Sequence, residues 1–118
     1  MVTCYLRYFI VPGKRKEFEE YGRRWTALIE KYGGTNVGYF VPDIPQEDLT
    51  SRHFSFPGLG AEGPMDVGIA LYSFRDVEAY NTYRREVAED EECKAITAQF
   101  NQTRCFVRYE RSFVRRIE

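Results

Sequence analysis

An α+β fold, built from one antiparallel sheet with helices on one face, is the fold class that the sequence predicts. Aromatic residues make up 16% of the chain, and large rings pack well on the pleated surface of a sheet. Segments with the pattern of strands alternate with segments whose apolar residues recur every three or four positions, as in amphipathic helices. The elements divide into two strand–helix–strand halves, and two such halves complete one antiparallel sheet.

The first half begins with a strand over Val2–Val11, which is rich in β-branched and aromatic residues and ends at a Pro-Gly pair. A helix is predicted from about Lys14 to Tyr32, because its apolar residues form a single stripe. Gly22 lies on that stripe. Since glycine destabilises a helix by about 1 kcal/mol relative to alanine, we expect a neighbouring element to approach closely there. Thr35–Val41 is the second predicted strand.

Residues 42–65 connect the two halves and show no periodic pattern. This segment holds four of the five prolines of the chain, and connections longer than about 15 residues are uncommon in compact domains. A long exposed loop is therefore predicted. Its middle, Arg52–Pro57, contains two phenylalanines, and we expect this segment to pack against another surface rather than to lie free in solvent.

The second half begins with a strand over Asp66–Phe74. Asp76 is well suited to cap the helix that follows, because an aspartate side chain accepts hydrogen bonds from the free amide groups of a first helical turn. Asp90 is expected to begin a shorter helix, with further acidic residues near its start. Thr103–Arg115 is predicted as a long final strand.

This order of elements is that of the ferredoxin-like βαββαβ unit, in which the first and last strands are neighbours. A short sequence repeat links these two strands, since Cys4–Tyr8 is similar to Cys105–Tyr109. The repeat places Cys4, Leu6, Tyr8, Cys105, Val107 and Tyr109 on the side of the helices. The opposite face is expected to carry Tyr5, Arg7, Phe9, Gly38, Phe40, Tyr72, Phe106, Arg108 and Glu110. That face is too apolar to stay in water, so we expect a second copy to cover it, sheet against sheet, in a two-fold homodimer.

Composition and charge argue against several functions. The 118 residues suffice for a single domain over residues 1–118. The balance of 17 basic and 18 acidic residues is unlike that of a nucleic-acid binder. No apolar run approaches the roughly 20 residues of a membrane span, and the N-terminus lacks the apolar segment of a signal peptide. A cytoplasmic location is therefore expected.

A metal centre, a disulfide framework and a cofactor site are also unsupported. The chain has three cysteines and one histidine, without the spacing of zinc ligands. None of the P-loop, GxGxxG, HExxH or GxSxG motifs occurs. The cysteines are expected to be small buried thiols in a reducing compartment, and no cofactor is predicted.

Arg7 and Arg108, together with Tyr5 and Glu110, form the strongest candidate site, on the face away from the helices. Two guanidinium groups beside aromatic rings can hold a carboxylate, a phosphate or a planar anionic ligand. The structural alternative is that Glu110 neutralises one arginine while the other forms an ion pair across the dimer.

His53 and Tyr72 complete the candidate ligand-binding residues. His53 is the only histidine, and an unperturbed histidine titrates near neutrality, so it could serve as a general base, although a single histidine in a loop is more often a surface residue. Tyr72, like Tyr39, could bind or protonate a substrate or could pack in the core with its hydroxyl hydrogen-bonded. No catalytic residue is assigned.

Segments distributed through almost the whole chain are shared with one known family. They are Thr3–Tyr8, Phe18–Tyr21, Trp25, Gly33–Thr35, Gly38–Phe40, Ala70–Phe74, Tyr80, Tyr83–Arg84, Cys93, Arg104–Cys105 and Tyr109–Phe113. Together they resemble the NIPSNAP family, within the ferredoxin-like dimeric α/β-barrel group. The resemblance implies a dimeric barrel, but it implies no established reaction and no catalytic residues. The connection Pro42–Pro64 is longer than in similar proteins, so a role of this loop would be particular to this chain.

Three functions remain open from the sequence. The first is a homodimeric barrel that binds a small aromatic or anionic metabolite or serves as an interaction module. The second is a cofactor-independent enzyme, a monooxygenase or an isomerase as among related dimeric barrels, with Tyr5, Arg7, Arg108 and His53 in positioning and proton transfer. The third is a purely structural dimer whose pocket is filled by its own side chains. The fold alone does not decide among them, because function resides in sites carried by folds.

Overall fold

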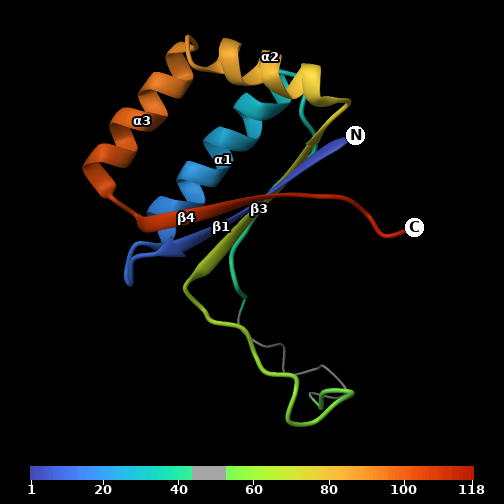
Figure 1. Ribbon diagram of the computed structural model, residues 1–118. Helices are drawn as coiled ribbons and strands as arrows, with labels where there is room; N and C mark the ends of the chain where they lie inside the picture. Colours follow the sequence, from blue (N-terminus) through green and yellow to red (C-terminus); the bar gives the residue numbers. More distant parts are fainter. Residues whose placement is uncertain (44–52) are drawn as a thin grey trace.

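The computed structural model describes residues 1–43 and 53–118. Its elements follow the predicted order along the chain: β1 (Val2–Ile10), α1 (Arg15–Lys31), β2 (Thr35–Phe40), β3 (Val67–Phe74), α2 (Val77–Val87), α3 (Glu91–Thr103) and β4 (Phe106–Val114). The strands form one antiparallel sheet in the order β2-β3-β1-β4. Figure 1 shows all of these helices on the same side of the sheet. The predicted α+β fold with ferredoxin-like topology is therefore confirmed.

Aspartates begin both helices of the second half, as predicted. The Asp76 carboxylate accepts a hydrogen bond from the amide of Ala79 at 2.8 Å, and the Asp90 carboxylate accepts one from the amide of Glu92 at 2.8 Å. Both bonds satisfy amide groups that a first helical turn leaves without a backbone partner. The final strand starts later than predicted, at Phe106, because α3 continues through Thr103 before the chain turns.

Gly22 allows α1 to lie close to β2. A Cβ atom at this position would lie 2.8 Å from the Cβ of Tyr39, closer than the contact distance of two carbon atoms. The Tyr39 ring also lies 6.4 Å from the ring of Phe18 and 6.2 Å from the ring of Tyr21, measured between centroids. The close approach predicted from the glycine is therefore confirmed.

The core lies between the sheet and the helices. Alternate residues of β1 are buried there, together with residues of all three helices; they include Cys4, Leu6, Tyr8, Phe18, Ile29, Tyr83, Val87 and Ile96. Cys4 and Cys105 are buried free thiols, and burial raises the pKa of both. Cys93 is a half-buried free thiol. Burial of Cys4 and Cys105 agrees with their predicted packing role.

β4 contains an irregularity that its sequence pattern did not predict. Phe9 and Ile10 are consecutive in β1, but their partners in β4 are Arg108 and Phe106, so Val107 is an extra residue, a β-bulge. The bulge turns the side chain of Phe106 toward the helices, where it is buried, and leaves Val107 75% exposed. The faces predicted for Phe106 and Val107 are therefore both wrong, because a strict alternation cannot pass through a bulge.

Tyr72 also lies on the face opposite to the predicted one. It pairs with Cys4 across β3 and β1, and directly paired residues point to the same side of a sheet, so its buried side chain faces the helices. The prediction was wrong because the residues that alternate with Tyr72 on the buried face are the small Gly68 and Ala70, which do not look like core residues in the sequence. Gly68 is needed there, since a Cβ atom would lie 2.4 Å from the Phe18 ring. Tyr109, in contrast, pairs with Tyr8 and lies on the helix side as predicted.

The sheet face away from the helices stays largely open in the described residues. Phe40 is 56% exposed and Leu71 is 36% exposed on this face, beside the half-buried Tyr5 and Phe9. We call the face that carries these residues, with Arg7, Ile69, Arg108 and Glu110, the open face. Its mixed apolar and charged character agrees with the prediction.

The connection between β2 and β3 is described from residue 53 onward, and residues 44–52 lie outside the described residues. In Figure 1 the described part extends away from the sheet before it returns to β3. Within residues 1–43 and 53–118, Phe56 is 70% exposed and Phe54 is 41% exposed, and packing of this segment on a further surface stays a prediction. Phe54 lies against Gly60 of the same loop.

Candidate functional site

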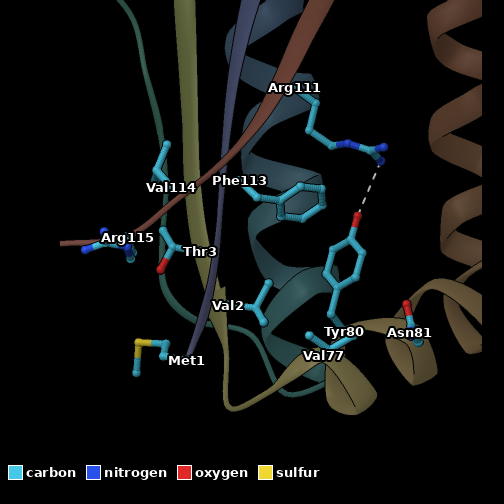
Figure 2. A pocket seen from close by; sticks show the side chains of 10 residues that line it. All are labelled: Met1, Val2, Thr3, Val77, Tyr80, Asn81, Arg111, Phe113, Val114 and Arg115. Atoms are coloured by element: carbon cyan, nitrogen blue, oxygen red, sulfur yellow. Dashed lines mark hydrogen bonds between the residues drawn. The ribbon is translucent and has the colours of Figure 1, made fainter.

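A surface groove lies between α2 and the ends of β1 and β4. Its volume is about 650 Å³. Figure 2 shows Arg111 at one end and Val77 at the other, with Phe113 beside Tyr80 between them. Most of the side chains that line it are apolar or aromatic, and we call it the apolar groove. Its lining residues are Met1, Val2, Thr3, Val77, Tyr80, Asn81, Arg111, Phe113, Val114 and Arg115.

A smaller cavity of about 100 Å³ adjoins the groove and lies between the sheet and the helices. Tyr80 and Arg111 line both spaces, so these two side chains, which are hydrogen-bonded to each other, border the cavity as well as the groove. Seven of the nine tyrosines of the chain line the cavity, and we call it the tyrosine cavity. They are Tyr8, Tyr21, Tyr39, Tyr72, Tyr80, Tyr83 and Tyr109, and Trp25, Arg84, Arg111 and Leu6 complete the lining.

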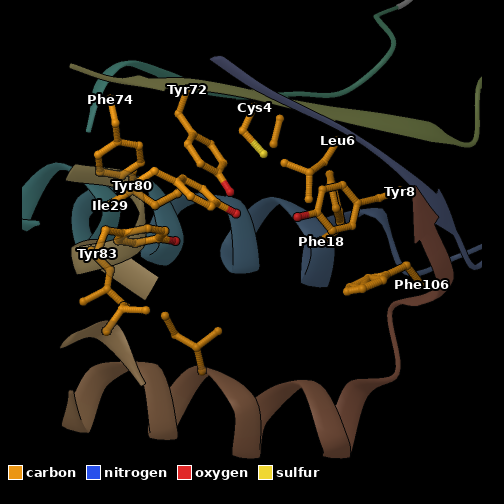
Figure 3. Packing of buried hydrophobic residues seen from close by; sticks show 14 of the residues in the cluster. Cys4, Leu6, Tyr8, Phe18, Ile29, Tyr72, Phe74, Tyr80, Tyr83 and Phe106 are labelled. Atoms are coloured by element: carbon orange, nitrogen blue, oxygen red, sulfur yellow. The ribbon is translucent and has the colours of Figure 1, made fainter. Parts of the chain in front are cut away.

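These tyrosines reach the same cavity from different elements. β1, β2 and β3 contribute Tyr8, Tyr39 and Tyr72, which all lie on the helix side of the sheet. Tyr80 and Tyr83 are three residues apart on α2, and such a spacing places two side chains on one helix face. Figure 3 shows the hydroxyl groups of Tyr8, Tyr72 and Tyr80 pointing toward one another. The Tyr8 and Tyr39 hydroxyls are 3.5 Å apart.

Burial keeps these hydroxyl groups protonated. It raises the pKa of Tyr8, Tyr21, Tyr39 and Tyr72 above the ordinary value for tyrosine, and it raises the pKa of Tyr83 to about 12. The charged phenolate is disfavoured because the surroundings solvate it less well than water does. Near pH 7 the five side chains are therefore neutral, and their O–H groups can donate, in part to one another as between Tyr8 and Tyr39.

Two arginines are the charged residues of the tyrosine cavity. Arg111 of β4 donates a hydrogen bond from Nη1 to the Tyr80 hydroxyl at 3.4 Å, and its guanidinium lies 5.2 Å from the centroid of the Phe113 ring. Arg84 of α2 follows Tyr83 at the same wall. Among the described residues, neither guanidinium forms an ion pair with a carboxylate, whereas Arg7, Arg23, Arg24 and Arg108 each do.

A second groove, of about 330 Å³, meets the tyrosine cavity from the side of α3. It shares Tyr21, Trp25 and Tyr109 with the cavity, and Thr97 of α3 and Arg104 line its outer part. The Nε1 donor of Trp25 is buried and makes no well-directed hydrogen bond with the described residues. The cavity is thus rich in donors, and a ligand with acceptor oxygens matches it.

The candidate site predicted from the sequence is assembled on the open face, away from this cavity. Glu110 accepts a hydrogen bond from Arg7 at 3.3 Å and another from Arg108 at 3.0 Å. The Arg108 guanidinium lies 3.7 Å from the centroid of the Phe9 ring, and Tyr5 is on the same face of β1. Glu110 therefore forms ion pairs with both arginines of the same chain. The structural alternative had predicted such a pair with only one of them.

The two remaining candidates are separated from that cluster. His53 is exposed at the start of the described loop, and Tyr72 lines the tyrosine cavity. The sequence analysis missed Arg84 and Arg111 as candidate binding residues. The sequence did contain a signal for Arg111, because it lies two residues after Tyr109 in β4 and therefore on the same face of the strand. Nothing in the sequence shows that α2 brings Arg84 to the same cavity.

The described parts of the chain support neither a metal site nor a membrane-spanning helix. Residues 1–43 and 53–118 contain no group of three His, Cys, Asp or Glu side chains that could hold a metal ion. None of the described helices is long and apolar enough to cross a membrane.

Comparison with known proteins identifies the fold. No protein-family model and no curated protein sequence matches the chain. An uncharacterised NIPSNAP domain protein from Burkholderia xenovorans has a similar structure, with a TM-score of 0.70 and 17% identity over 99% of this chain and 95% of that one. A NIPSNAP family protein from Agrobacterium tumefaciens is similar with a TM-score of 0.70 and 19% identity, covering 99% of this chain and 93% of the other.

The same architecture extends beyond proteins with that name. A protein from Nitrosomonas europaea, provisionally described as an antibiotic biosynthesis monooxygenase, has a TM-score of 0.63 and 8% identity, with 100% of both chains covered. At these identities the likeness shows the fold alone. The chain has the fold of NIPSNAP domain proteins, as the sequence resemblance implied.

Proposed function

We propose that this protein binds a small anionic ligand, with the anionic group held in the tyrosine cavity by Arg84 and Arg111. The proposal is carried by one observation: within the described residues, these two guanidinium groups adjoin the cavity without an acidic partner. Both arginines are exposed residues, so a carboxylate or phosphate can reach them, and the fork of an arginine matches either group.

The hydroxyl groups of the cavity support this ligand chemistry. The tyrosines whose pKa is raised by burial are neutral donors near pH 7, and the Trp25 Nε1 is a donor as well. Hydrogen bonds from such donors to a charged acceptor are roughly twice as strong as those between neutral groups. An anion in the cavity therefore satisfies both the arginines and the donors around them.

Trp25 allows a direct test, because it is the only tryptophan of the chain and lines the tyrosine cavity. Acetate and inorganic phosphate are titrated at constant ionic strength, with chloride as the reference anion. The expected result is a saturable change in tryptophan fluorescence with at least one of the two anions. Changing Arg84→Gln or Arg111→Gln should weaken binding by about 10-fold or more, since hydrogen bonds to charged groups contribute about 1.5–3 kcal/mol.

Arg85→Gln is the matched control, because Arg85 follows Arg84 on α2 but does not line the cavity. Its affinity for the anion should equal that of the wild type. The proposal fails if neither anion gives a saturable change, or if Arg85→Gln weakens binding as much as the two cavity variants do. Thermal unfolding followed by circular dichroism checks that each variant is folded.

We further propose that the protein is a homodimer that buries the open face, as the sequence analysis expects. Exposed apolar residues such as Phe40 and Leu71 lie there beside the charged cluster around Glu110. A two-fold pair of sheets would bury these apolar side chains in a self-complementary interface.

Native mass spectrometry of the purified chain tests the assembly. A dimer is expected for the wild type and a monomer for Leu71→Asp, because that variant places a charge in the middle of the buried face. Val77→Asp is the control, since Val77 is 62% exposed on α2, on the other side of the molecule. A wild-type monomer at micromolar concentration would exclude the proposed dimer.

An enzymatic function would use the same cavity with restricted chemistry. Because burial raises the pKa of Tyr8 and Tyr72, these hydroxyls are weaker acids than an exposed tyrosine and are not bases near pH 7, so they can donate a hydrogen bond but transfer a proton poorly. Among the described residues that line the cavity there is no carboxylate or histidine. A reaction here would therefore depend on stabilising negative charge on an oxygen atom, which is also what anion binding requires.

A further inference from the structure

We infer that the ligand is an amphiphile, with an oxyanion head group in the tyrosine cavity and an unbranched hydrocarbon chain in the apolar groove. This inference rests on the proposed function, because the same two arginines hold the head group. It adds the chemical class of the remainder of the ligand and the surface that receives it.

The volumes of the two spaces indicate which one holds the head group of the ligand and which one holds its hydrocarbon chain. The tyrosine cavity has a volume of about 100 Å³, and a cavity that binds benzene measures about 150 Å³. A carboxylate or phosphate group fits the smaller space, whereas an aromatic ring does not. The apolar groove, at about 650 Å³, has room for a chain of several methylene groups. The greater part of a ligand anchored in the cavity must therefore lie outside it.

Arg111 borders both spaces, so a head group that it binds lies beside the apolar groove. The Nη1 atom of Arg111 donates to the Tyr80 hydroxyl, and both residues line the cavity as well as the groove. Beyond them the groove continues over Val2, Phe113 and Val77 (Figure 2). A head group bound at Arg111 thus points its substituent along apolar side chains.

Those apolar side chains are unusually open to solvent. Val77 is 62% exposed and Phe113 is 52% exposed, so a hydrocarbon chain that covers them removes apolar surface of both partners from water. Charge at one end and apolar surface along the rest are the complement of a fatty acid or an alkyl phosphate. The groove on the α3 side fits less well, because it has about half the volume.

The inference is tested by varying the length of the hydrocarbon chain of the ligand. Acetate, butanoate, hexanoate and octanoate are titrated below the concentration at which octanoate forms micelles, with Trp25 fluorescence as the readout. Affinity should rise two- to four-fold for each added methylene group, the upper value corresponding to full burial. Octyl phosphate tests the second oxyanion head group, and 1-octanol, which has the same chain without a charge, should bind far more weakly.

Two matched variants show which of the two grooves holds the hydrocarbon chain of the ligand. Val77→Asp puts a negative charge in the apolar groove, and it should fold, because an acidic residue is favoured in the first turn of a helix. It should remove the dependence on chain length while acetate binding changes little. Thr97→Asp places the same charge in the other groove and should keep the full dependence on chain length.

The outcomes separate this inference from the proposed function. Equal affinities for acetate and octanoate overturn the amphiphile and leave anion binding in place. Loss of the chain-length dependence in Thr97→Asp rather than in Val77→Asp overturns the assignment to the apolar groove. Binding of 1-octanol as tightly as octanoate shows an apolar site without an anion and contradicts both proposals, as does the absence of binding by every probe.

Discussion

The rings of Tyr8 and Tyr109 lie opposite each other across β1 and β4, with their centroids 5.5 Å apart and their planes inclined by 25°. Tyr8 is 3% exposed and Tyr109 is 57% exposed, so this stacked pair runs from the core to the part of the cavity wall that solvent reaches. Such a pair contributes about 0.5–1.5 kcal/mol beyond the burial of its area. Core packing and cavity shape are therefore coupled through these two rings.

Alkaline titration should distinguish the buried tyrosines from the rest. Burial raises the folded-state pKa of Tyr8, Tyr39 and Tyr72 above the unfolded value of about 10. Their contribution to stability is complete below pH 10 and is lost as the pH rises further, because only the unfolded chain then ionises readily. Absorbance at 295 nm should show a group of tyrosines that ionises only when circular dichroism reports unfolding.

The variant Tyr8→Phe provides the control for this titration. It should reduce the late-ionising absorbance by the amount of one tyrosine and leave the earlier part of the curve unchanged. Complete ionisation of all tyrosines near pH 10 in a folded protein would contradict the assignment.

Gly22→Ala should destabilise the protein although alanine favours helices. The added Cβ would lie 2.8 Å from the Tyr39 Cβ, and overpacking of this kind costs about 1–3 kcal/mol, against a gain of about 1 kcal/mol in helix propensity. We expect a net loss of up to about 2 kcal/mol in urea unfolding. Gly63→Ala is the control, because no atom of the described residues lies within 4 Å of a Cβ there. Equal stability of Gly22→Ala and wild type would show that α1 and β2 can move apart freely.

Asp90 should make stability depend on pH in the acidic range. Its Oδ2 accepts hydrogen bonds from the Lys31 ammonium at 2.8 Å and the Tyr32 hydroxyl at 2.5 Å, and these bonds hold its pKa below the usual range. The lowered pKa stabilises the fold above the unfolded pKa of about 3.9, and this effect is lost as the pH falls through the folded pKa. Asp90→Asn should therefore have a lower urea midpoint than wild type at pH 7, with the difference shrinking toward pH 3.

The matching control for this measurement is Glu89→Gln, which removes a neighbouring exposed carboxylate that has no ion pair among the described residues. Its difference from wild type should be small at both pH values. A difference for Asp90→Asn that stays constant from pH 7 to pH 3 would mean that the charge of Asp90 does not stabilise the fold.

Arg108→Ala should separate the open face from the cavity. Exposed ion pairs contribute about 0–1 kcal/mol, so the loss of the Glu110 contact should leave the melting temperature nearly unchanged. Anion binding followed by Trp25 fluorescence should also be unchanged, whereas dimer dissociation in sedimentation experiments should become easier. If this variant abolishes anion binding and Arg111→Gln does not, the binding site is on the open face.

The sequence was sufficient for the fold because its signals are local and agree with one another. Asp76 and Asp90 cap helices through their own side chains, and Gly22 marks a close approach that a single residue can reveal. The order of elements then leaves few topologies for one antiparallel sheet.

The candidate site could not be derived in the same way, because it depends on long-range geometry. One extra residue, Val107, sets the faces of β4, and a bulge has no strong sequence signal. Arg84 and Arg111 come together only through the packing of α2 against the sheet. The cluster of Arg7, Arg108 and Glu110 could be predicted, because β1 and β4 are neighbours and the alternation of side chains places these residues on the same face of both strands.

The bulge at Val107 joins two functions in the last strand. Phe106, before the bulge, closes the core beside Tyr8 and Phe18, while Tyr109 and Arg111, after it, belong to the cavity wall. With the bulge between them, Phe106 and Tyr109 face the same side and their ring centroids lie 5.9 Å apart, so a substitution at Tyr109 that changes the cavity wall must also be compatible with the packing of Phe106 in the core.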